Sequence, residues 1–334
     1  MTPTNRLAVR LAVVMDPIED IKYAKDTTLA MLLAAQARGY ELTYLTLADL
    51  YLRDGVALGS TRPLTVRADP ADWYSLREPR VQPLGEFDAI LMRKDPPFDV
   101  EYIYSTYILE RAELAGALVV NRPQGLRDMN EKVYTAWFPD CCAPTLITRD
   151  MAAMSAFAAE FGRVVAKPLH GMGGRSIFVV DPTDKNMNVV FETLTDYGSH
   201  YAIVQKYLPE IASTGDSRVL LIDGEPVPYA LARMPSATDN RGNLAAGAKG
   251  VGRPLNARDR ELAARIGPWL ADRGMLFVGL DVIGGYVTEI NVTSPTGVRE
   301  LDKQFGIDIA GLLLDAIERR LPGRRERARA AAAP

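Results

Sequence analysis

The sequence predicts an α/β protein that begins with an open sheet. Short apolar runs that are typical of buried strands alternate with patterns that are typical of helices. The strands are expected at residues 7–15, 41–47, 87–92 and 118–121, and the helices at residues 27–38 and 102–114. Gly39 follows the first helix, where glycine favours the end of a helix. This alternation favours an open α/β sheet, in which ligands bind at the carboxyl ends of the strands.

The rest of the chain mixes helices with pairs of strands. Helices are expected at residues 131–138, 151–161, 256–273 and 307–321, and strands at residues 163–168, 177–180, 201–209, 217–222 and 225–231. Asp150 is expected to cap the second of these helices. An Asp223-Gly224 turn is expected to join the last two strands into a hairpin. Residues 54–83 are weakly periodic and contain several prolines, so we interpret them as an irregular connection.

Composition excludes several classes of protein. The chain has 334 residues, of which 48% are hydrophobic and 24% are charged, as in ordinary globular proteins. A net charge of −3 gives no electrostatic reason to expect binding to nucleic acid or to a membrane surface. No apolar run has the length of a transmembrane helix, and residues 1–6 lead into the first strand without a signal-peptide core. We therefore expect a cytoplasmic protein.

Cysteine and histidine usage narrows the chemistry. The only two cysteines, Cys141 and Cys142, are adjacent, so neither a disulfide framework nor a cysteine metal site is expected. The only two histidines are His170 and His200. A Ser-His-Asp triad, a Cys-His pair or a zinc site built from several histidines is therefore close to excluded.

The most informative stretch is residues 275–295, which reads as a β-hairpin with a Gly284-Gly285 turn. Asp281, Glu289 and Asn291 interrupt its apolar strands, and residues two apart in a strand project from the same face. A two-residue turn would pair Asp281 with Thr288. A three-residue connection or one bulge would instead place Asp281 opposite Glu289.

In the second register, two carboxylates and an amide oxygen converge on one face of the sheet. Carboxylates so placed repel each other unless a cation lies between them. Oxygen ligands of this kind, completed by water and phosphate, suit Mg²⁺. The alternative is a solvated hairpin face whose polar side chains point outward.

A second candidate region is the strand at residues 163–168 and the glycine-rich loop that follows it. Lys167 lies within an apolar run, where an unpaired ammonium group is costly, so an anion such as a nucleotide phosphate is its expected partner. The loop at residues 170–176 lies between two strands, which suits a flap whose backbone N–H groups close over phosphates. A plain hairpin turn is the alternative.

Three further segments carry charge. Arg93-Lys94-Asp95 follows a strand, so it is either a ligand contact or a solvated loop. Arg218 and Arg233 are expected at roughly opposite ends of the hairpin at residues 217–231. Residues 235–252 are rich in small residues and contain Arg241 and Lys249, which suits a mobile lid that carries cations or a plain loop.

Several segments together resemble the bacterial glutathione synthetases, which are members of the ATP-grasp superfamily. The matching segments are 14–17 (VMDP), 90–99 (ILMRKDPPFD), 126–132 (LRDMNEK), 167–174 (KPLHGMGG), 241–247 (RGNLAAG) and 289–296 (EINVTSPT). They span about residues 7–316, and their combination is specific to that family although each could recur elsewhere in the superfamily.

The resemblance implies an ATP-grasp fold with an N-terminal open α/β domain. The implied units are an N-terminal domain at residues 1–128, a central lobe at 129–205, a C-terminal lobe at 206–322 and a frayed tail at 323–334. It implies a homo-oligomer, expected to be a tetramer, that joins glycine to γ-glutamylcysteine with ATP. Mg²⁺ is the implied metal ion, with Mn²⁺ as an alternative, and ATP is a co-substrate.

The resemblance also implies roles for individual residues. Lys132 and Lys167 would hold ATP phosphates beneath a flap that includes Gly171, Met172, Gly173 and Gly174. Gln205, Lys206, Tyr207 and Leu208 would line the adenine pocket, chiefly through backbone groups, and Asp216 would reach the ribose. Asp281, Glu289 and Asn291 would hold the metal ions. Arg218 and Arg233 would face substrate carboxylates or the transferred phosphate.

The sequence departs from the family pattern at two positions of the flap. We expect an aspartate in place of His170 and a small residue in place of Arg175. These departures are expected to affect the rate of the reaction or the affinity for the nucleotide more than the function itself. Two other functions are alternatives. The same residues would serve an ATP-grasp ligase with a different carboxylate or amine, and only substrate screening separates it from a glutathione synthetase. A nucleotide-binding regulator without turnover is disfavoured, because the lysines and the acidic residues are all present.

Overall fold

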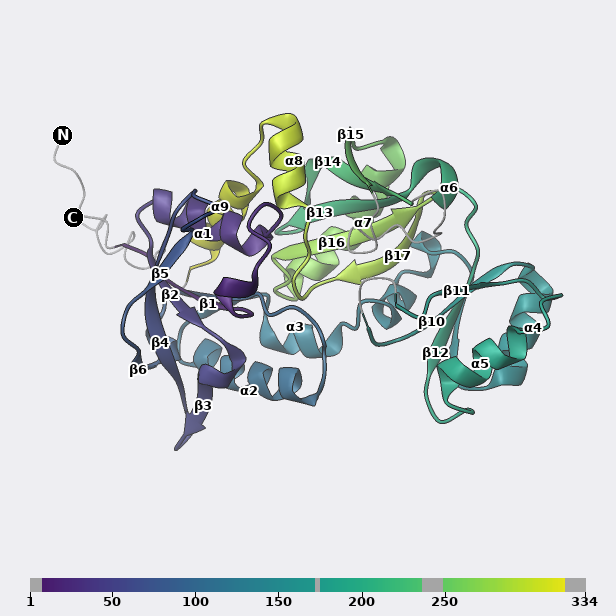
Figure 1. Cartoon of the computed structure of the whole chain (residues 1–334), viewed down its shortest axis with the longest axis horizontal. Helices are drawn as coiled ribbons and strands as arrows, with labels where there is room; N and C mark the ends of the chain where they lie inside the picture. The colour runs from purple at the N-terminus through teal and green to yellow at the C-terminus, as the bar shows by residue number, and fades with distance from the viewer. Residues whose placement is uncertain (1–7, 172–174, 236–248, 322–334) are drawn as a thin grey trace.

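The computed structural model of the chain describes residues 8–171, 175–235 and 249–321. Within these ranges the strands form three sheets. In Figure 1 the C-terminal sheet lies between the N-terminal sheet and the sheet that comes second along the chain, which is called the middle sheet below. The main strands of the N-terminal sheet are, in order across it, β3 (Leu50–Arg53), β4 (Val56–Val66), β2 (Glu41–Leu45), β1 (Arg10–Val14), β7 (Ala89–Met92) and β8 (Leu118–Val120). β1 runs parallel to both β2 and β7, and β7 runs parallel to β8. The predicted open α/β sheet is confirmed.

Both faces of β1 are buried, which explains why its sequence is continuously apolar. Leu11 and Val13 lie in the same core as α1 (Thr27–Ala37) and α9 (Ile309–Arg320). Ala12 and Val14 lie in the other core, with α2 (Val100–Leu114). α3 (Pro123–Asp128) packs beside α2. The last helix within the described ranges therefore covers a face of the first sheet (Figure 1).

The prediction of an irregular connection at residues 54–83 was wrong. β4 extends through most of its first half, and β5 (Tyr74–Leu76) and β6 (Arg80–Pro83) pair with β4. Every second residue along the first part of β4 is buried, which is the alternation of a strand with one covered face. Pro63 lies within β4, where its carbonyl oxygen accepts from the N–H of Arg77 at 3.0 Å. β3 and β4 form a hairpin across the two-residue turn Asp54-Gly55, a local signal that the sequence analysis did not use. The pairing of β4 with β2 and β6 joins segments that are farther apart in the chain.

The middle sheet is antiparallel and consists of β11 (Phe178–Val180), β10 (Val164–Pro168), β12 (Ala202–Lys206) and β9 (Thr145–Thr148). α4 (Met151–Phe161) and α5 (Met187–Thr195) pack against it around their own core. The Asp150 side chain accepts from two backbone N–H groups at the start of α4, as predicted. The helix expected at residues 131–138 is instead a short 3₁₀ helix, η4 (Val133–Trp137), and it is followed by a second one, η5 (Pro139–Cys141).

The C-terminal sheet has the order β15 (Lys249–Pro254), β14 (Glu225–Met234), β13 (Asp216–Ile222), β16 (Phe277–Ile283) and β17 (Tyr286–Asn291). α7 (Ala257–Asp272) packs on β13 and β14, and α8 (Val298–Phe305) packs on β14 and β15. Most of the expected lid, residues 236–248, lies outside the described residues. Its last part, residues 249–252, belongs to β15 and pairs with β14, so this part is a strand.

Short elements complete the connections. They are η1 (Ile18–Asp20), η2 (Leu47–Asp49), η3 (Leu84–Glu86) and α6 (Ile211–Thr214). The sequence analysis did not predict α3, α5, α6 or α8. No helix in the described ranges is long and apolar enough to cross a membrane.

Asn121 joins the N-terminal sheet to the C-terminal sheet. Its amide nitrogen donates to the carbonyl oxygens of Phe277 at 2.7 Å and Val292 at 2.6 Å, and its amide oxygen accepts from the N–H of Phe277 at 2.9 Å. Asn121 directly follows β8, Phe277 begins β16 and Val292 directly follows β17. One buried side chain thus fixes the ends of three strands relative to one another.

Candidate active site

The hairpin β16–β17 adopts the register that brings the acidic residues together. Ile283 pairs with Tyr286 across the Gly284-Gly285 turn, as expected for a two-residue turn. The register then shifts, so that Asp281 pairs with Glu289 and Gly279 pairs with Asn291. The extra residue of this bulge is Thr288, and the bulge alternative of the sequence analysis is therefore confirmed.

Asp281 is buried between two arginines. Arg218 contacts both carboxylate oxygens, at 2.6 Å through Nε and 3.1 Å through Nη2, and Arg233 contacts Oδ2 at 2.9 Å. Asn291 donates from Nδ2 to the same oxygen at 3.2 Å. Burial alone would raise the pKa of Asp281, but Arg218 and Arg233 outweigh burial and lower the pKa well below its usual value.

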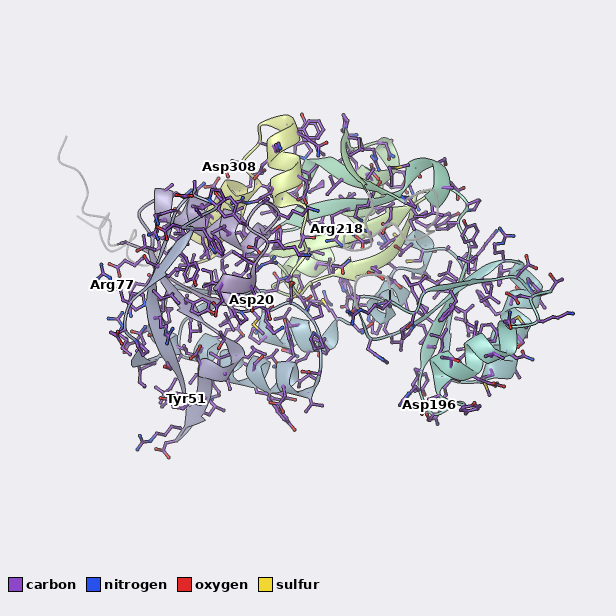
Figure 2. The ribbon with its side chains drawn as sticks, viewed as in Figure 1. Asp20, Tyr51, Arg77, Asp196, Arg218 and Asp308 are labelled. Carbon is purple, nitrogen blue, oxygen red and sulfur yellow. The ribbon has the colours of Figure 1, made fainter. Side chains whose placement is uncertain are left out.

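The two arginines lie at the same end of the hairpin β13–β14, and their expected placement at opposite ends was wrong. Arg218 pairs with Leu231, and Arg233 pairs with Asp216, two residues further from the turn. β13 starts at the open end of the hairpin and β14 ends there, so Arg218 near the start of β13 lies close to Arg233 near the end of β14. Figure 2 shows Arg218 near the middle of the molecule.

Asp216 is a second buried carboxylate in this cluster. Its Oδ2 contacts Arg233 at 2.5 Å, and the backbone oxygen of Asp216 accepts from Nε of Arg233 at 3.3 Å. Its Oδ1 is buried, and no described residue donates a hydrogen bond to it. Burial raises the pKa of the Asp216 carboxyl, although Arg233 opposes the shift. The free oxygen is therefore an acceptor that a ligand hydroxyl could satisfy.

Glu289 faces two lysines from different parts of the chain. Its Oε1 lies 3.8 Å from Nζ of Lys132 and 3.6 Å from Nζ of Lys167, which are ion pairs longer than hydrogen bonds. Lys132 precedes η4, and Lys167 lies in β10. Both ammonium groups are almost fully buried, whereas 22% of the Glu289 side chain is exposed. The carboxylate thus lies at the open side of the cluster.

Backbone contacts position Lys132 beside the hairpin. The N–H of Ile290 donates to the carbonyl oxygen of Glu131 at 2.8 Å, so the segment before η4 follows the edge of β17. Glu131 also contacts Nζ of Lys132 at 2.5 Å. Burial alone would lower the pKa of Lys132, but Glu289 and Glu131 outweigh burial and raise the pKa. Lys132 therefore stays charged.

The predicted order of strand, glycine-rich loop and strand is confirmed by the antiparallel pairing of β10 with β11, which suits either a phosphate flap or a plain hairpin turn. Met172, Gly173 and Gly174 lie outside the described residues. The carbonyl oxygen of Gly171 accepts from Nζ of Lys132 at 3.2 Å. His170 and Arg175, on either side of the loop, are exposed.

The predicted adenine segment leaves the middle sheet at the end of β12. Gln205 is buried and donates to the hydroxyl of Thr145 at 3.0 Å. The N–H groups of Lys206 and Tyr207 donate to the backbone oxygens of Pro144 and Arg163, both at 3.0 Å. Because these N–H groups already have partners, adenine would have to bind other backbone groups of the segment, including those of Leu208.

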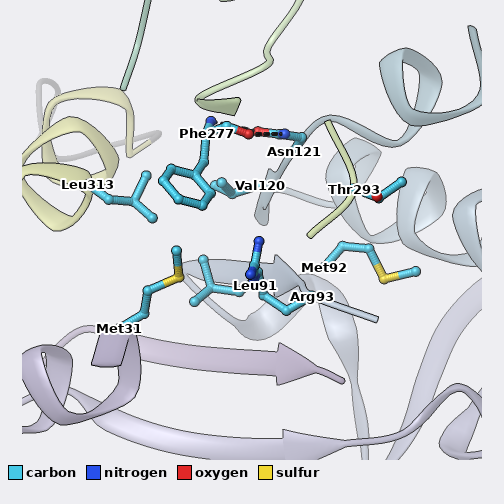
Figure 3. Close-up of a pocket in the computed structure, with 9 residues that line it drawn as sticks. All are labelled: Met31, Leu91, Met92, Arg93, Val120, Asn121, Phe277, Thr293 and Leu313. Atoms are coloured by element: carbon cyan, nitrogen blue, oxygen red, sulfur yellow. Dashed lines mark hydrogen bonds between the residues drawn. The ribbon is translucent and has the colours of Figure 1, made fainter. Parts of the chain in front are cut away.

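A small cavity of about water size lies between the N-terminal sheet and the C-terminal sheet (Figure 3). The Arg93 guanidinium points into it; it is buried and receives no carboxylate within 4 Å from any described residue. Nε of Arg93 donates to the hydroxyl of Thr28 at 3.1 Å, and Nη2 donates to the oxygen of Pro295 at 3.2 Å. Burial lowers the pKa of Arg93. Lys94, the next residue along the chain, does have a carboxylate partner: it forms an ion pair with Asp16 at 2.8 Å.

The donor set around the hairpin fits a hard divalent cation. It consists of the carboxylates of Asp281 and Glu289 and the amide of Asn291, and no described group of three or more His, Cys, Asp and Glu side chains offers another metal site. Asp281 is already neutralised by arginines, whereas Glu289 makes only long contacts. Glu289 is therefore the member of the set with the most freedom to bind a cation.

The structure brings together many of the predicted site residues that it describes. Lys132, Lys167, Arg218, Arg233, Asp281, Glu289 and Asn291 form one cluster, with Asp216 at its edge. The Gln205 side chain and the N–H groups of Lys206 and Tyr207 contact residues outside this cluster. Sequence reasoning did not single out Asn130 and Glu131, which both contact Lys132 of this cluster. Their position directly before Lys132, in an Asn-Glu-Lys sequence, was the available signal.

Comparison with known proteins places this site in a family. A family model described as the N-terminal domain of prokaryotic glutathione synthetase matches residues 9–127, and one described as the ATP-grasp domain of the same proteins matches residues 131–306. Together they cover most of the chain.

Curated relatives match over nearly their whole length. A glutathione synthetase from Pseudomonas putida is 56% identical over 318 residues, which are 95% of this chain and 100% of the relative. One from Shewanella oneidensis is 55% identical over 313 residues, which are 94% of this chain and 99% of the relative. One from Vibrio cholerae is 53% identical, over 94% of this chain and 98% of the relative.

Solved structures share the fold at lower identity. A D-cycloserine synthetase is 16% identical, with a TM-score of 0.66 over 93% of this chain and 99% of that chain. A RimK domain ATP-grasp protein from Sphaerobacter thermophilus is 20% identical, with a TM-score of 0.60 over 92% of this chain and 99% of that chain. These neighbours support the fold, and the family models and relatives decide the assignment. The chain therefore belongs to the prokaryotic glutathione synthetase family, whose members have the ATP-grasp fold.

Proposed function

We propose that this protein joins glycine to the cysteinyl carboxylate of γ-glutamylcysteine with ATP, through an acyl phosphate. The chain is a glutathione synthetase and an ATP-dependent ligase. It uses ATP as a substrate and requires a divalent metal ion, which we propose to be Mg²⁺, with Mn²⁺ as a substitute. The observation that carries the proposal is the meeting of Lys132, Lys167, Arg218 and Arg233 around the carboxylates of Asp281 and Glu289.

The reaction needs charge neutralisation more than it needs a general base. The carboxylate of γ-glutamylcysteine attacks the γ-phosphorus of ATP, and ADP leaves with the electron pair of the broken P–O bond. The amine of glycine then attacks the acyl carbon, and the tetrahedral intermediate expels phosphate. Negative charge collects on phosphate oxygens in both steps, where fixed cations stabilise it. A site built from lysines and arginines, without a histidine, suits this chemistry.

Each cation has a proposed task. Lys132 and Lys167 contact ATP phosphates, because both ammonium groups are buried and lie on either side of Glu289 at distances longer than a hydrogen bond. Lys132 also contacts Glu131 and the oxygen of Gly171, but an ammonium group has a third proton to donate. Arg218 and Arg233 face the substrate carboxylate or the transferred phosphate from the other side of Asp281. Burial of these groups strengthens their attraction for an anion.

The nucleotide base and ribose have proposed partners at the end of the middle sheet. The segment Gln205–Leu208 lies along adenine, and the flap of residues 171–174 covers the phosphates. Asp216 accepts from the ribose through its Oδ1, which no described group satisfies. Loss of an acceptor at this position would therefore weaken the binding of ATP and of adenosine by the same factor.

Asp281, Glu289 and Asn291 would hold the metal ion. When bound, such an ion neutralises phosphate charge and orients the triphosphate. Lys132 and Lys167 also supply positive charge that faces Glu289.

We also propose that the protein is a cytoplasmic homotetramer. Its two cysteines are free thiols, which suits a reducing compartment. The outer face of α2 exposes Val100, Tyr104 and Leu114, at 56%, 54% and 71%, and such an apolar face suits a subunit contact. Sedimentation analysis at several protein concentrations tests the number of subunits.

The activity is tested by measuring ADP release with ATP, Mg²⁺, γ-glutamylcysteine and glycine, and by omitting each in turn. We expect ADP only when all four are present, with one glutathione formed for each ADP. If glycine has no effect and a different amine drives ADP release, the protein is an ATP-grasp ligase with another acceptor. If no amine and carboxylate pair drives ADP release, it is not a ligase.

A further inference from the structure

Asn130 connects the two segments that carry the phosphate-binding lysines. Its Oδ1 accepts from the N–H groups of Lys132 and Val133, both at 3.0 Å, and so caps the start of η4. Its Nδ2 donates to the carbonyl oxygen of Leu169 at 3.1 Å. Leu169 directly follows β10 and lies between Lys167 and Gly171. A single amide thus contacts the backbone of Lys132 and the base of the flap.

A second contact joins the same two segments but depends on a group that ATP would engage. Nζ of Lys132 donates to the oxygen of Gly171 at 3.2 Å and contacts Glu131 at 2.5 Å. An ammonium group has three protons to share among Gly171, Glu131 and any phosphate. When phosphate takes part of this capacity, the contact to Gly171 weakens. The bond from Asn130 to Leu169 involves neither lysine side chain and is unaffected.

We infer that Asn130 is a positioning residue for the triphosphate, which holds the base of the flap beside Lys132 while the lysine side chains engage the nucleotide. The inference rests on the proposed function, because it assumes that Lys132 and Lys167 contact ATP phosphates. It adds a residue that touches no phosphate itself. Its effect reaches the nucleotide through the spacing of Lys132, Lys167 and Gly171.

The backbone of Glu131, the residue after Asn130, extends the connection made by Asn130 to the proposed metal ligands. The oxygen of Glu131 accepts from the N–H of Ile290, which lies between Glu289 and Asn291. The segment 130–132 is therefore hydrogen-bonded to β17 on one side and to the end of β10 on the other. Displacement of the flap base would change the distance from Lys167 to Glu289, which is 3.6 Å in the structure.

The test is the variant Asn130→Ser. Serine keeps a neutral oxygen that caps a helix but is too short to donate to Leu169. The matched control is Asn256→Ser, because Asn256 caps α7 through the same kind of bond, to the N–H of Asp259, and lies outside the proposed site. Thermal unfolding of both variants shows whether the change of a capping asparagine to serine has a general effect on stability.

Binding of ATP and of AMP to each protein is then measured by titration calorimetry. We expect Asn130→Ser to lower the affinity for ATP by about tenfold, which corresponds to the loss of one partly buried hydrogen bond. AMP lacks the β- and γ-phosphates, so its affinity should change by less than about twofold. The Michaelis constant for ATP should rise, and that for glycine should not. Asn256→Ser should leave all of these values unchanged.

Two results would overturn the inference. One is an unchanged affinity for ATP in Asn130→Ser, and the other is an equal loss of affinity for ATP and AMP, which indicates general damage to the nucleotide site. Failure of the proposed function gives a different result, because the unmodified protein would then not bind ATP or would not release ADP with glycine and γ-glutamylcysteine.

Discussion

Asp281 pairs with Glu289 across the β16–β17 hairpin because Thr288 forms a bulge between them and the turn. The regular register of a two-residue turn would have paired Asp281 with Thr288 and turned Glu289 to the opposite face. One extra residue therefore decides whether the candidate metal site exists. The bulge also leaves the two carboxylates in different surroundings: Asp281 is neutralised by arginines, and Glu289 faces lysines at longer distances.

Replacement of Glu289 by glutamine should abolish turnover with little change in fold. The amide keeps the size of the side chain but loses the charge that would bind the cation, so ADP release should fall by about 100-fold or more. The side chain is partly exposed, so unfolding should change little. Glu225→Gln, at an exposed position of β14, is the control and should retain activity. Retained activity in Glu289→Gln would place the metal site elsewhere.

Replacement of Asp281 by asparagine should destabilise the fold. Arg218 would lose its only charged partner among the described residues and would remain buried. An unpaired buried charge costs about 3–5 kcal/mol in the free energy of unfolding, which urea denaturation measures. Asp315→Asn removes an exposed partner of Arg38 and should cost less than about 1 kcal/mol. Equal losses in the two variants would contradict this reading of the cluster.

Replacement of Asn121 by alanine should also destabilise the protein, without any change in charge. The change removes three hydrogen bonds that join β8 to β16 and β17 and leaves buried backbone groups without partners. We expect a loss of about 3 kcal/mol in the free energy of unfolding, measured in urea. Asn186 precedes α5 and makes no capping bond with its side chain, so Asn186→Ala should change stability by about 0.5 kcal/mol or less. A loss that small in Asn121→Ala would mean that the sheets are joined by other contacts.

The carboxyl of Asp302 should make stability depend on pH. Burial raises its pKa from 3.8 to about 6, although the N–H of Ile309 opposes the shift. An acid whose pKa is raised on folding binds protons more tightly in the folded state, so stability falls as pH rises from about 4 to about 6. Asp302→Asn keeps the acceptor for Ile309 and removes the charge. Its melting temperature, relative to that of the unmodified protein, should therefore rise across this window, and a constant difference would contradict the assignment.

Local patterns predicted many of the elements well. The strand around β1, the helices α1 and α4 with their caps, and the hairpin turn at Gly284-Gly285 all follow from neighbouring residues. The strands at residues 56–83 were not predicted. The hairpin of β3 with β4 has a local signal in its Asp54-Gly55 turn, but β4 also pairs with residues 42–44 and 74–83, which no short pattern connects to it. Pairing over such separations depends on which surfaces the folded chain covers, and composition alone suggested a loop.

The sequence by itself determined the family and the set of chemical groups. Two histidines and two adjacent cysteines removed most covalent mechanisms, and the acidic hairpin with Lys132 and Lys167 remained as the centre of the site. Only the tertiary structure decided how these groups meet. Arg218 and Arg233 lie on strands that run in opposite directions, so residues that are 15 positions apart reach the same carboxylate. Charge balance and hydrogen bonding in a buried cluster depend on distances between segments far apart in the chain, and those distances exist only after folding.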